Sequence, residues 1–134
     1  MIPIKTPEEI AVMREGGHIL AQIMKELIVQ VKPGVTTDQL DKIAEAKIRE
    51  AGAKPAFLNY QGFPRTMCTS VNEEVVHAIP SEEKILKAGD IVSLDLGVIY
   101  KGYYSDMART IPVGEVAPET SRLVRVCREA LRLG

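Results

Sequence analysis

The segment from residue 91 to residue 111 constrains the fold of this chain more than any other. Its two arms are rich in β-branched and aromatic residues, and a Lys101-Gly102 pair lies between them. Glycine supplies the positive φ that a tight turn between two strands requires. The segment therefore predicts a hairpin of two antiparallel strands, with Tyr100 facing Tyr103 across the turn.

The predicted register brings two aspartates together. It places Asp95 opposite Ala108 and Asp106 opposite Gly97. Because side chains alternate along a strand, both aspartates then point to one side of the sheet, about 7–8 Å apart at the backbone. Two carboxylates at that separation can bind one cation, or two cations bridged between them. A one-residue bulge in either strand would reverse this orientation.

The alternative is that this aspartate pair lies on an ordinary solvated sheet face, where acidic residues are common even though strands disfavour them. The first arm favours a ligand-lined surface, because one of its sides is apolar and the other is small and polar. The apolar side holds Leu94, Leu96 and Val98, and the polar side holds Ser93, Asp95 and Gly97.

Length, charge and cysteine content limit the class of protein. The 134 residues, 46% of them hydrophobic, are enough for one domain spanning 1–134. Seventeen basic and eighteen acidic residues predict no general attraction to nucleic acid or acidic membranes. No leader peptide and no run of about 20 apolar residues occurs, so we expect a cytoplasmic protein. Cys68 and Cys127 fit no zinc-finger spacing; free thiols in a reducing compartment are expected, and pairing stays open.

Helical periodicity predicts two helices before the strands. The first follows a Thr6 cap, with Pro7 at the first helical position and Glu9 three residues after the cap, and it stops at 32–34. The second begins at Thr36 or Thr37 and ends at Gly52.

The remaining chain predicts strands, a charged connection and a last helix. The strand-like texture runs through 65–71 and into 72–80, and 81–89 is the connection to the hairpin. The last helix begins near Pro118 or Glu119, with an apolar stripe that nothing later in the chain can cover. Its opposite face carries four arginines, which form either a solvated face or a site for an acidic partner. These arginines are Arg122, Arg125, Arg128 and Arg132.

Five sequence runs resemble one enzyme family, the type I methionine aminopeptidases, and occur in the family's order. They are MREGG at 13–17, YQGFP at 60–64, NEEVVHAIP at 72–80, LKAGDIVSLDLG at 86–97 and GYYSD at 102–106. The resemblance extends essentially from residue 2 to residue 133. A relative of prolidase or creatinase would share the fold, but the 60–80 run and the absence of an extra N-terminal domain argue against it.

The resemblance implies the pita-bread fold, an α/β (α+β) arrangement, of which this chain is one half of the pseudo-two-fold, with an antiparallel sheet and flanking helices. By motif match, Asp95 is similar to the family's bidentate metal ligand, and Asp106 to the carboxylate that bridges both metals. His77 is similar to the catalytic histidine that contacts the scissile amide. The implied cofactors are two divalent ions, and manganese, iron, cobalt and zinc all suit such a site.

The resemblance also implies a methionine pocket. Tyr60, Phe63, Phe57, Cys68 and His77 correspond to substrate-binding positions. An apolar slot with aromatic walls suits an unbranched thioether. At the position after Tyr60 this chain has a glutamine where many members have histidine.

The family completes its metal site with one histidine and two glutamates from the second half of the fold, and this chain ends before them. The sequence therefore predicts the N-terminal half of a methionine aminopeptidase, whose substrates are the N-terminal methionine peptides of nascent proteins, near the ribosome. Metal binding by this half alone is expected to be weak and peptidase activity absent. The alternative is an inactive half-fold that serves as a binding or assembly module, covered by a second copy or by the missing half.

Overall fold

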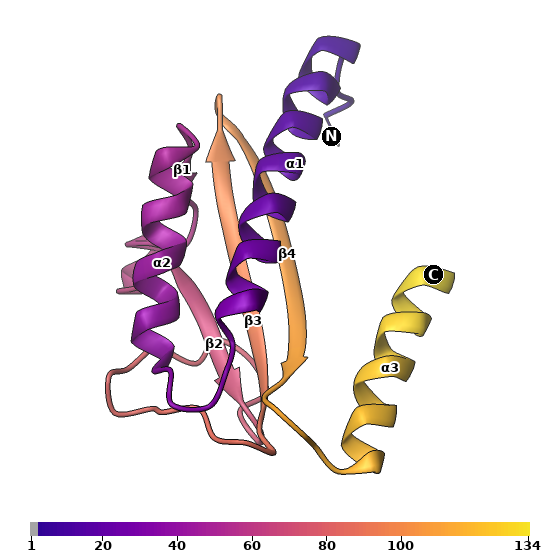
Figure 1. Ribbon diagram of the computed structural model, residues 1–134. Coiled ribbons are helices and arrows are strands. Elements are labelled where there is room, and N and C mark those ends of the chain that lie inside the picture. Colours follow the sequence, from indigo (N-terminus) through magenta and orange to yellow (C-terminus); the bar gives the residue numbers. More distant parts are fainter. Residues whose placement is uncertain (1–2) are drawn as a thin grey trace.

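The computed structural model describes residues 3–134, which form a four-stranded sheet with helices. The elements are α1 (Pro7–Gln30), α2 (Thr37–Glu50), β1 (Lys54–Pro55), the 3₁₀ turn η1 (Tyr60–Gly62), β2 (Met67–Val71), β3 (Ile91–Tyr100), β4 (Tyr103–Pro112) and α3 (Pro118–Leu133). Figure 1 shows α1 and α2 side by side against one face of the sheet, and α3 standing beyond β4. The mixed architecture of helices and antiparallel strands confirms the predicted fold class.

The strand β3 is the centre of the sheet. One of its edges pairs with β1 and then with β2, and the other pairs with β4, always antiparallel. Within residues 3–134, the outer edge of β4 pairs with no further strand. In the part of the chain that the structure describes, the sheet therefore ends on β4, a ten-residue strand with one unpaired edge.

The β3–β4 hairpin has the register that the turn predicts. Tyr100 faces Tyr103, and the pairing continues without a bulge along both strands. The two turn residues, Lys101 and Gly102, have φ values of 47° and 87°, as a type I′ turn requires. The right-handed twist of the strands matches this turn, which therefore fixes the register from one end.

The hydrophobic core lies between the sheet and the helices α1 and α2. The apolar side of β3 is fully buried there, together with Leu20, Leu27 and Leu40 from the helices. The first helix begins at the predicted Thr6 cap, and the second begins at Thr37, one of its two predicted starts. Thr6 pairs with Glu9 and Thr36 pairs with Gln39 in reciprocal capping boxes. Because the core occupies one face of the sheet, Asp95 and Asp106 face the opposite side.

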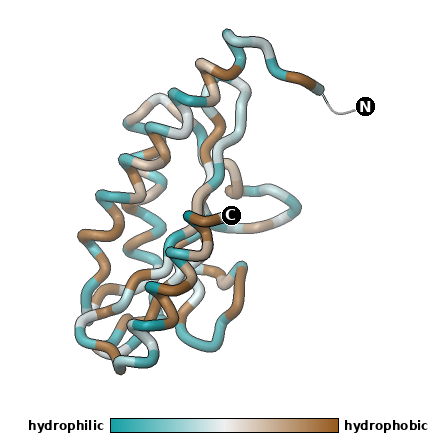
Figure 2. The backbone as a smooth tube through the Cα atoms, turned by 90° about the vertical axis from the view of Figure 1, so that its right-hand side faces the viewer, coloured by the Kyte–Doolittle hydropathy of each residue, from teal (hydrophilic) through white to brown (hydrophobic). Residues whose placement is uncertain are grey.

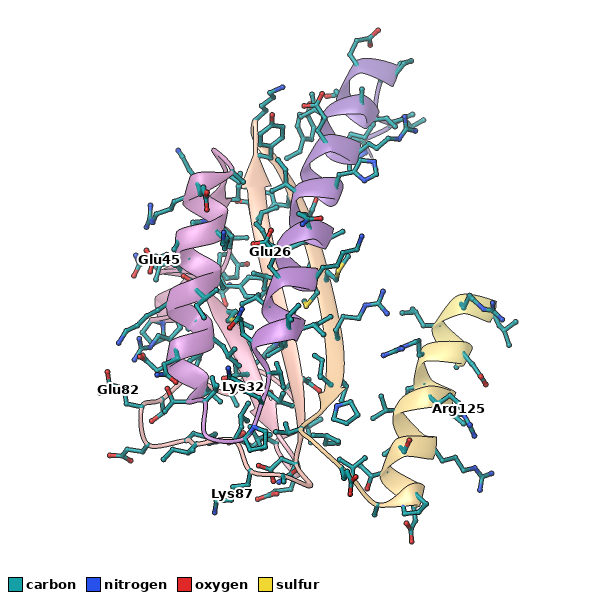
Figure 3. The ribbon with its side chains drawn as sticks, viewed as in Figure 1. Glu26, Lys32, Glu45, Glu82, Lys87 and Arg125 are labelled. Atoms are coloured by element: carbon teal, nitrogen blue, oxygen red, sulfur yellow. The ribbon has the colours of Figure 1, made fainter. Side chains whose placement is uncertain are left out.

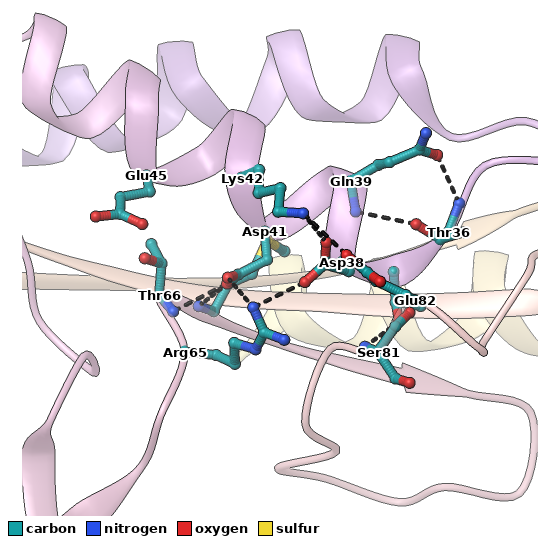
Figure 4. Close-up of polar contacts among 12 residues, drawn as sticks. Thr36, Asp38, Gln39, Asp41, Lys42, Glu45, Arg65, Thr66, Ser81 and Glu82 are labelled. Atoms are coloured by element: carbon teal, nitrogen blue, oxygen red, sulfur yellow. Dashed lines mark hydrogen bonds and ion pairs between the residues drawn. The ribbon is translucent and has the colours of Figure 1, made fainter.

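A buried polar cluster fixes the start of β2 to α2 (Figure 4). The Asp41 carboxylate accepts hydrogen bonds from the backbone N–H groups of Thr66 and Met67, both at 2.9 Å. Asp38 forms ion pairs with Lys42 and Arg65, each at 2.7 Å. The pairing between helix and strand was not predicted from the sequence, and it sets the position of the strand that carries Cys68.

The prediction of a strand over 72–80 is wrong. The strand β2 ends at Val71, and no strand forms between it and β3. The physical reason is a set of specific contacts. Asn72 adopts a left-handed φ of 53°, its side chain accepts the Ile91 N–H, and the Glu74 carboxylate accepts the Val71 N–H. The segment 81–89 is a connection, as expected, with a single β-bridge between Ile85 and Thr36.

The last helix, α3, begins at Pro118 as predicted and has no buried residue. Its large apolar side chains Leu123, Val126, Leu131 and Leu133 are exposed. Apolar and polar residues alternate along the length of α3 (Figure 2). Its four arginines are exposed, and Arg125 points away from the sheet (Figure 3). No helix in residues 3–134 is long and apolar enough to cross a membrane.

Candidate metal and substrate site

A cavity of about 500 Å³ opens on the sheet face that the helices leave free. All seven residues that the sequence singled out for metal, catalytic or substrate roles line it. Its complete lining is Phe57, Tyr60, Gln61, Gly62, Phe63, Pro64, Cys68, His77, Ile79, Asp95 and Asp106. Residues from five separate places in the chain thus meet in one cavity, although the role of each stays a prediction.

The two aspartates are placed by neighbouring strands. Asp95 on β3 lies opposite Ala108, and Asp106 on β4 lies opposite Gly97, so each carboxylate has a small neighbour across the hairpin. Burial raises the pKa of the Asp95 carboxyl, the nearby charge of Asp106 raises it further, and His77 acts in the opposite direction. The pair is therefore a site of concentrated negative charge.

Gly97 allows the aromatic wall to approach the sheet. A Cβ atom at this position would lie 2.9 Å from Phe57 Cε1, closer than real Cβ atoms come, and 3.0 Å from Ala56 Cβ, which is also a tight contact. The backbone N–H of Ala56 donates to the Gly97 carbonyl at 3.0 Å. The absence of a side chain at residue 97 therefore lets Phe57 pack directly beside the two aspartates.

Cys68 on β2 pairs directly with Asp95 on β3. The thiol is free and buried in the cavity wall. Burial, followed by the charges of Asp95 and Asp106, raises the pKa of Cys68 to about 11. The thiol is therefore neutral at physiological pH and presents an apolar sulfur surface to the cavity.

The segment 57–64 forms a compact turn over the site. The Asn59 N–H donates to the Phe63 carbonyl at 2.8 Å, and the Phe63 N–H donates to the Tyr60 carbonyl at 2.9 Å. Asn59 and Gln61 have left-handed φ values of 66° and 48°. Such conformations in residues other than glycine store strain and gather at functional sites. This turn brings both Tyr60 and Phe63 to the cavity.

His77 reaches the cavity from the irregular segment after β2. Its backbone is left-handed, with a φ of 59°. The next residue is held against β2, because the Thr69 N–H donates to the Ala78 carbonyl at 3.0 Å. The left-handed His77 therefore directly precedes a residue that is hydrogen-bonded to β2.

The sequence did not single out the lining residues Gly62, Pro64 and Ile79. All three lie inside the family-like runs 60–64 and 72–80, which is the signal that could have found them. Ile79 lies two residues after His77, and the two side chains line the same cavity.

The donor atoms of Asp95 and Asp106 suit a divalent cation, which would relieve the repulsion between the two carboxylates. Within residues 3–134 no three histidine, cysteine, aspartate or glutamate side chains gather as a metal-binding group. The two aspartates therefore fit a metal site as part of a ligand set.

The fold and this site define a class of protein. Residues 11–134 match the model of metallopeptidase family M24. The chain belongs to metallopeptidase family M24. Its similarity to methionine aminopeptidases covers the whole chain: it is 46% identical over 134 residues to the methionine aminopeptidase of Clostridium acetobutylicum, and equally to methionine aminopeptidase 1 of Bacillus subtilis. Each of these two matches covers 100% of this chain and 54% of the relative.

Solved structures of methionine aminopeptidases and related peptidases are also similar to this chain. The methionine aminopeptidase of Thermotoga maritima superposes with a TM-score of 0.96 at 43% identity, covering 98% of this chain and 53% of that one. The Xaa-Pro dipeptidase of Bacillus anthracis is similar at a TM-score of 0.76 and 30% identity, covering 89% of this chain and 32% of that one. The chain spans about half the length of the methionine aminopeptidases it matches, and it has the architecture of half a pita-bread fold.

Proposed function

We propose that this chain is the N-terminal half of a methionine aminopeptidase, which removes the first methionine of nascent proteins with the help of two divalent metal ions. One observation carries the proposal. Asp95 and Asp106 line one cavity together with His77 and an aromatic wall. The similarity to methionine aminopeptidases along the whole chain supports the choice of substrate.

Asp95 and Asp106 would hold the metal ions. Bound divalent ions lower the pKa of water and stabilise the negative charge that develops on the scissile carbonyl. His77 donates a hydrogen bond to that carbonyl oxygen as its charge grows.

Tyr60, Phe63 and Phe57 form the aromatic wall against which the methionine side chain packs, and the neutral Cys68 thiol completes it. Thioether sulfur makes favourable contacts with aromatic ring edges, and a charged side chain would lose its hydration in this slot.

The isolated chain is expected to bind metal weakly and to have little or no peptidase activity. Two carboxylates leave most coordination positions of each ion to water, and without a cation they repel each other. The remaining ligands are proposed to come from the other half of the fold, in keeping with the 54% of the relatives' length that this chain covers.

A complementation assay tests this proposal. The purified chain is mixed with manganese or cobalt and a methionyl-alanyl peptide, with and without the second half of a related methionine aminopeptidase. Activity is expected only in the mixture, and Asp95→Asn and Asp106→Asn are expected to abolish it. Glu83→Gln, an exposed acid outside the cavity, is the control and should leave activity unchanged. Turnover by the purified chain alone would refute the half-site proposal.

The second candidate function is an assembly module. It is favoured by the free outer edge of β4 and by α3, whose large apolar side chains are exposed. An unpaired strand edge beside an apolar helix surface is a typical site of association. Sedimentation equilibrium gives the mass, and calorimetry with Mn²⁺ tests the aspartates. A dimer that binds no metal would favour assembly over the peptidase.

We also propose a cytoplasmic location close to the ribosome. The two free thiols suit a reducing compartment, and substrates with a newly made N-terminus occur there. Fractionation of cells that express the chain, with ribosome pelleting, tests this location.

A further inference from the structure

The segment between β2 and β3 forms no helix or strand, yet it holds the His77 backbone in an unfavourable left-handed conformation. Its left-handed φ of 59° costs energy in a residue with a side chain, so surrounding contacts must stabilise it. Val75 and Val76, just before it, are 86% and 63% exposed and contribute little packing. Hydrogen bonds and an ion pair, by contrast, attach this segment to the rest of the fold.

We call residues 72–78 the His77 arc. Hydrogen bonds to the sheet hold both of its ends. At the start, the Asn72 N–H donates to the Ile91 carbonyl at 3.0 Å, and the Ile91 N–H donates to Asn72 Oδ1 at 3.0 Å. At the end, the Ala78 carbonyl accepts the Thr69 N–H. Both sets of hydrogen bonds attach the His77 arc to the sheet, and residues 73–77 span the gap between them.

Glu74 holds the middle of the arc. Its Oε2 accepts the Val71 N–H at 2.8 Å, and its own N–H donates to the Val71 carbonyl at 3.1 Å. Its other carboxylate oxygen, Oε1, forms an ion pair with Lys84 Nζ. Both side chains of this pair are about two-thirds buried, with exposures of 30% and 34%, so solvent screens the pair less than a fully exposed one.

Lys84 is itself fixed to the core. Its carbonyl accepts the Thr37 N–H, at the first turn of α2, at 3.0 Å. Nearby, Thr37 Oγ1 donates to the Ser81 carbonyl at 3.1 Å and accepts the Ser81 N–H at 2.9 Å. The ion pair therefore connects the arc that carries His77 to a helix that packs in the hydrophobic core.

We infer that Glu74, through its ion pair with Lys84, is a positioning residue for His77. It closes the turn at Val71 with one carboxylate oxygen and ties the arc to α2 with the other. What His77 does once positioned rests on the proposed function, whereas the positioning itself can be measured in the chain without metal or peptide.

The chain offers a direct readout because it has only two histidines, His18 on α1 and His77. Each gives its own imidazole signals in a ¹H–¹³C NMR spectrum. The test variants are Glu74→Gln, which keeps an acceptor for the Val71 N–H but removes the charge, and Lys84→Met. The matched control is Glu73→Gln, which removes the same charge from the exposed neighbouring residue.

We expect Glu74→Gln and Lys84→Met to shift and broaden the His77 signals alike, while those of His18 stay in place. Lys84→Arg, unlike Lys84→Met, should give the native His77 signals, because arginine can keep the ion pair with Glu74. Unchanged His18 signals show that the fold is intact, and if Glu74→Gln does not fold, the two variants of Lys84 decide the question.

Native His77 signals in both test variants would overturn the inference, and so would an equal change in Glu73→Gln. The failure of the proposed function gives a different result. If His77→Ala keeps full activity in the complementation assay while Glu74→Gln still disturbs His77 in the spectrum, the positioning is correct and the catalytic role is wrong.

Discussion

Gly97 on β3 lies directly opposite Asp106 on β4, and a Cβ atom at residue 97 would lie only 2.9 Å from Phe57 Cε1. One residue thus serves two purposes. It keeps the partner of an aspartate small, and it lets an aromatic ring come down onto the sheet. The two aspartates and the aromatic wall of the cavity therefore meet at this position.

Replacing this glycine is expected to disturb the cavity. In Gly97→Ala the new methyl group would lie 2.9 Å from Phe57 Cε1, so the ring must move. Overpacking of this kind costs about 1–3 kcal/mol, measured as the free energy of unfolding in urea. Gly17→Ala, where a Cβ meets nothing within 4 Å on a helix, is the control and should be neutral or stabilise by about 0.5–1 kcal/mol. Equal stability of Gly97→Ala and the native chain would contradict the assigned contact.

Removing the Asp41 carboxylate is expected to loosen β2 from α2. Asp41→Ala leaves the buried N–H groups of Thr66 and Met67 without their acceptor, which costs about 1–3 kcal/mol. Urea unfolding measures the loss. Glu45→Ala, which breaks only the exposed ion pair with Arg49, should change stability by no more than about 0.5 kcal/mol. A similar effect of both substitutions would show that the buried acceptor does not hold the strand.

Acid is expected to remove the contribution of Asp38. The hydrogen bond from Lys42 lowers the pKa of Asp38 below its ordinary value of 3.8, and the Arg65 charge acts in the same direction. Since the folded pKa is the lower one, this carboxylate stabilises the fold above pH 3.8, and the effect disappears as the pH falls through the folded pKa. Unfolding of the native chain and of Asp38→Asn, compared from neutral pH downward, should give a stability difference that shrinks on acidification. A difference that grows on acidification would reverse the sign of the assigned shift.

The two thiols are expected to react at very different rates. The raised pKa of Cys68, about 11, leaves on the order of 10²-fold less thiolate near neutral pH than an ordinary thiol has, and its burial slows access further. Cys127 is exposed. Iodoacetamide labelling followed by mass spectrometry should modify Cys127 first, and Asp95→Asn should speed the labelling of Cys68. Faster labelling of Cys68 in the native chain would contradict this account of the cavity wall.

Local chemistry explains which parts of the fold were predictable. The Lys101-Gly102 turn fixes the hairpin register, so the common orientation of the two aspartates followed from the sequence. The cap at Thr6 likewise placed the start of the first helix correctly, and the second helix starts at Thr37, one of its two predicted positions. In each case the residues that decide the structure lie within a few positions of one another.

Contacts between distant residues explain what the sequence left out. The β-branched content of 72–80 suggested a strand, but the bonds of Asn72 to Ile91 and of Glu74 to Lys84 make it a loop. Those partners lie ten or more residues away, beyond the reach of any local pattern. The burial of Asp41 beneath β2 was hidden for the same reason.

The hairpin makes the separation of Asp95 and Asp106 a property of one short piece of chain. Substitutions in the aromatic turn at 57–64 change the side chains that line the cavity wall. They leave the spacing of the two aspartates unchanged, because the hairpin sets that spacing. The carboxylate pair and the aromatic turn are thus encoded on separate stretches of the polypeptide, and Gly97 is the point at which a change in one stretch is felt by the other.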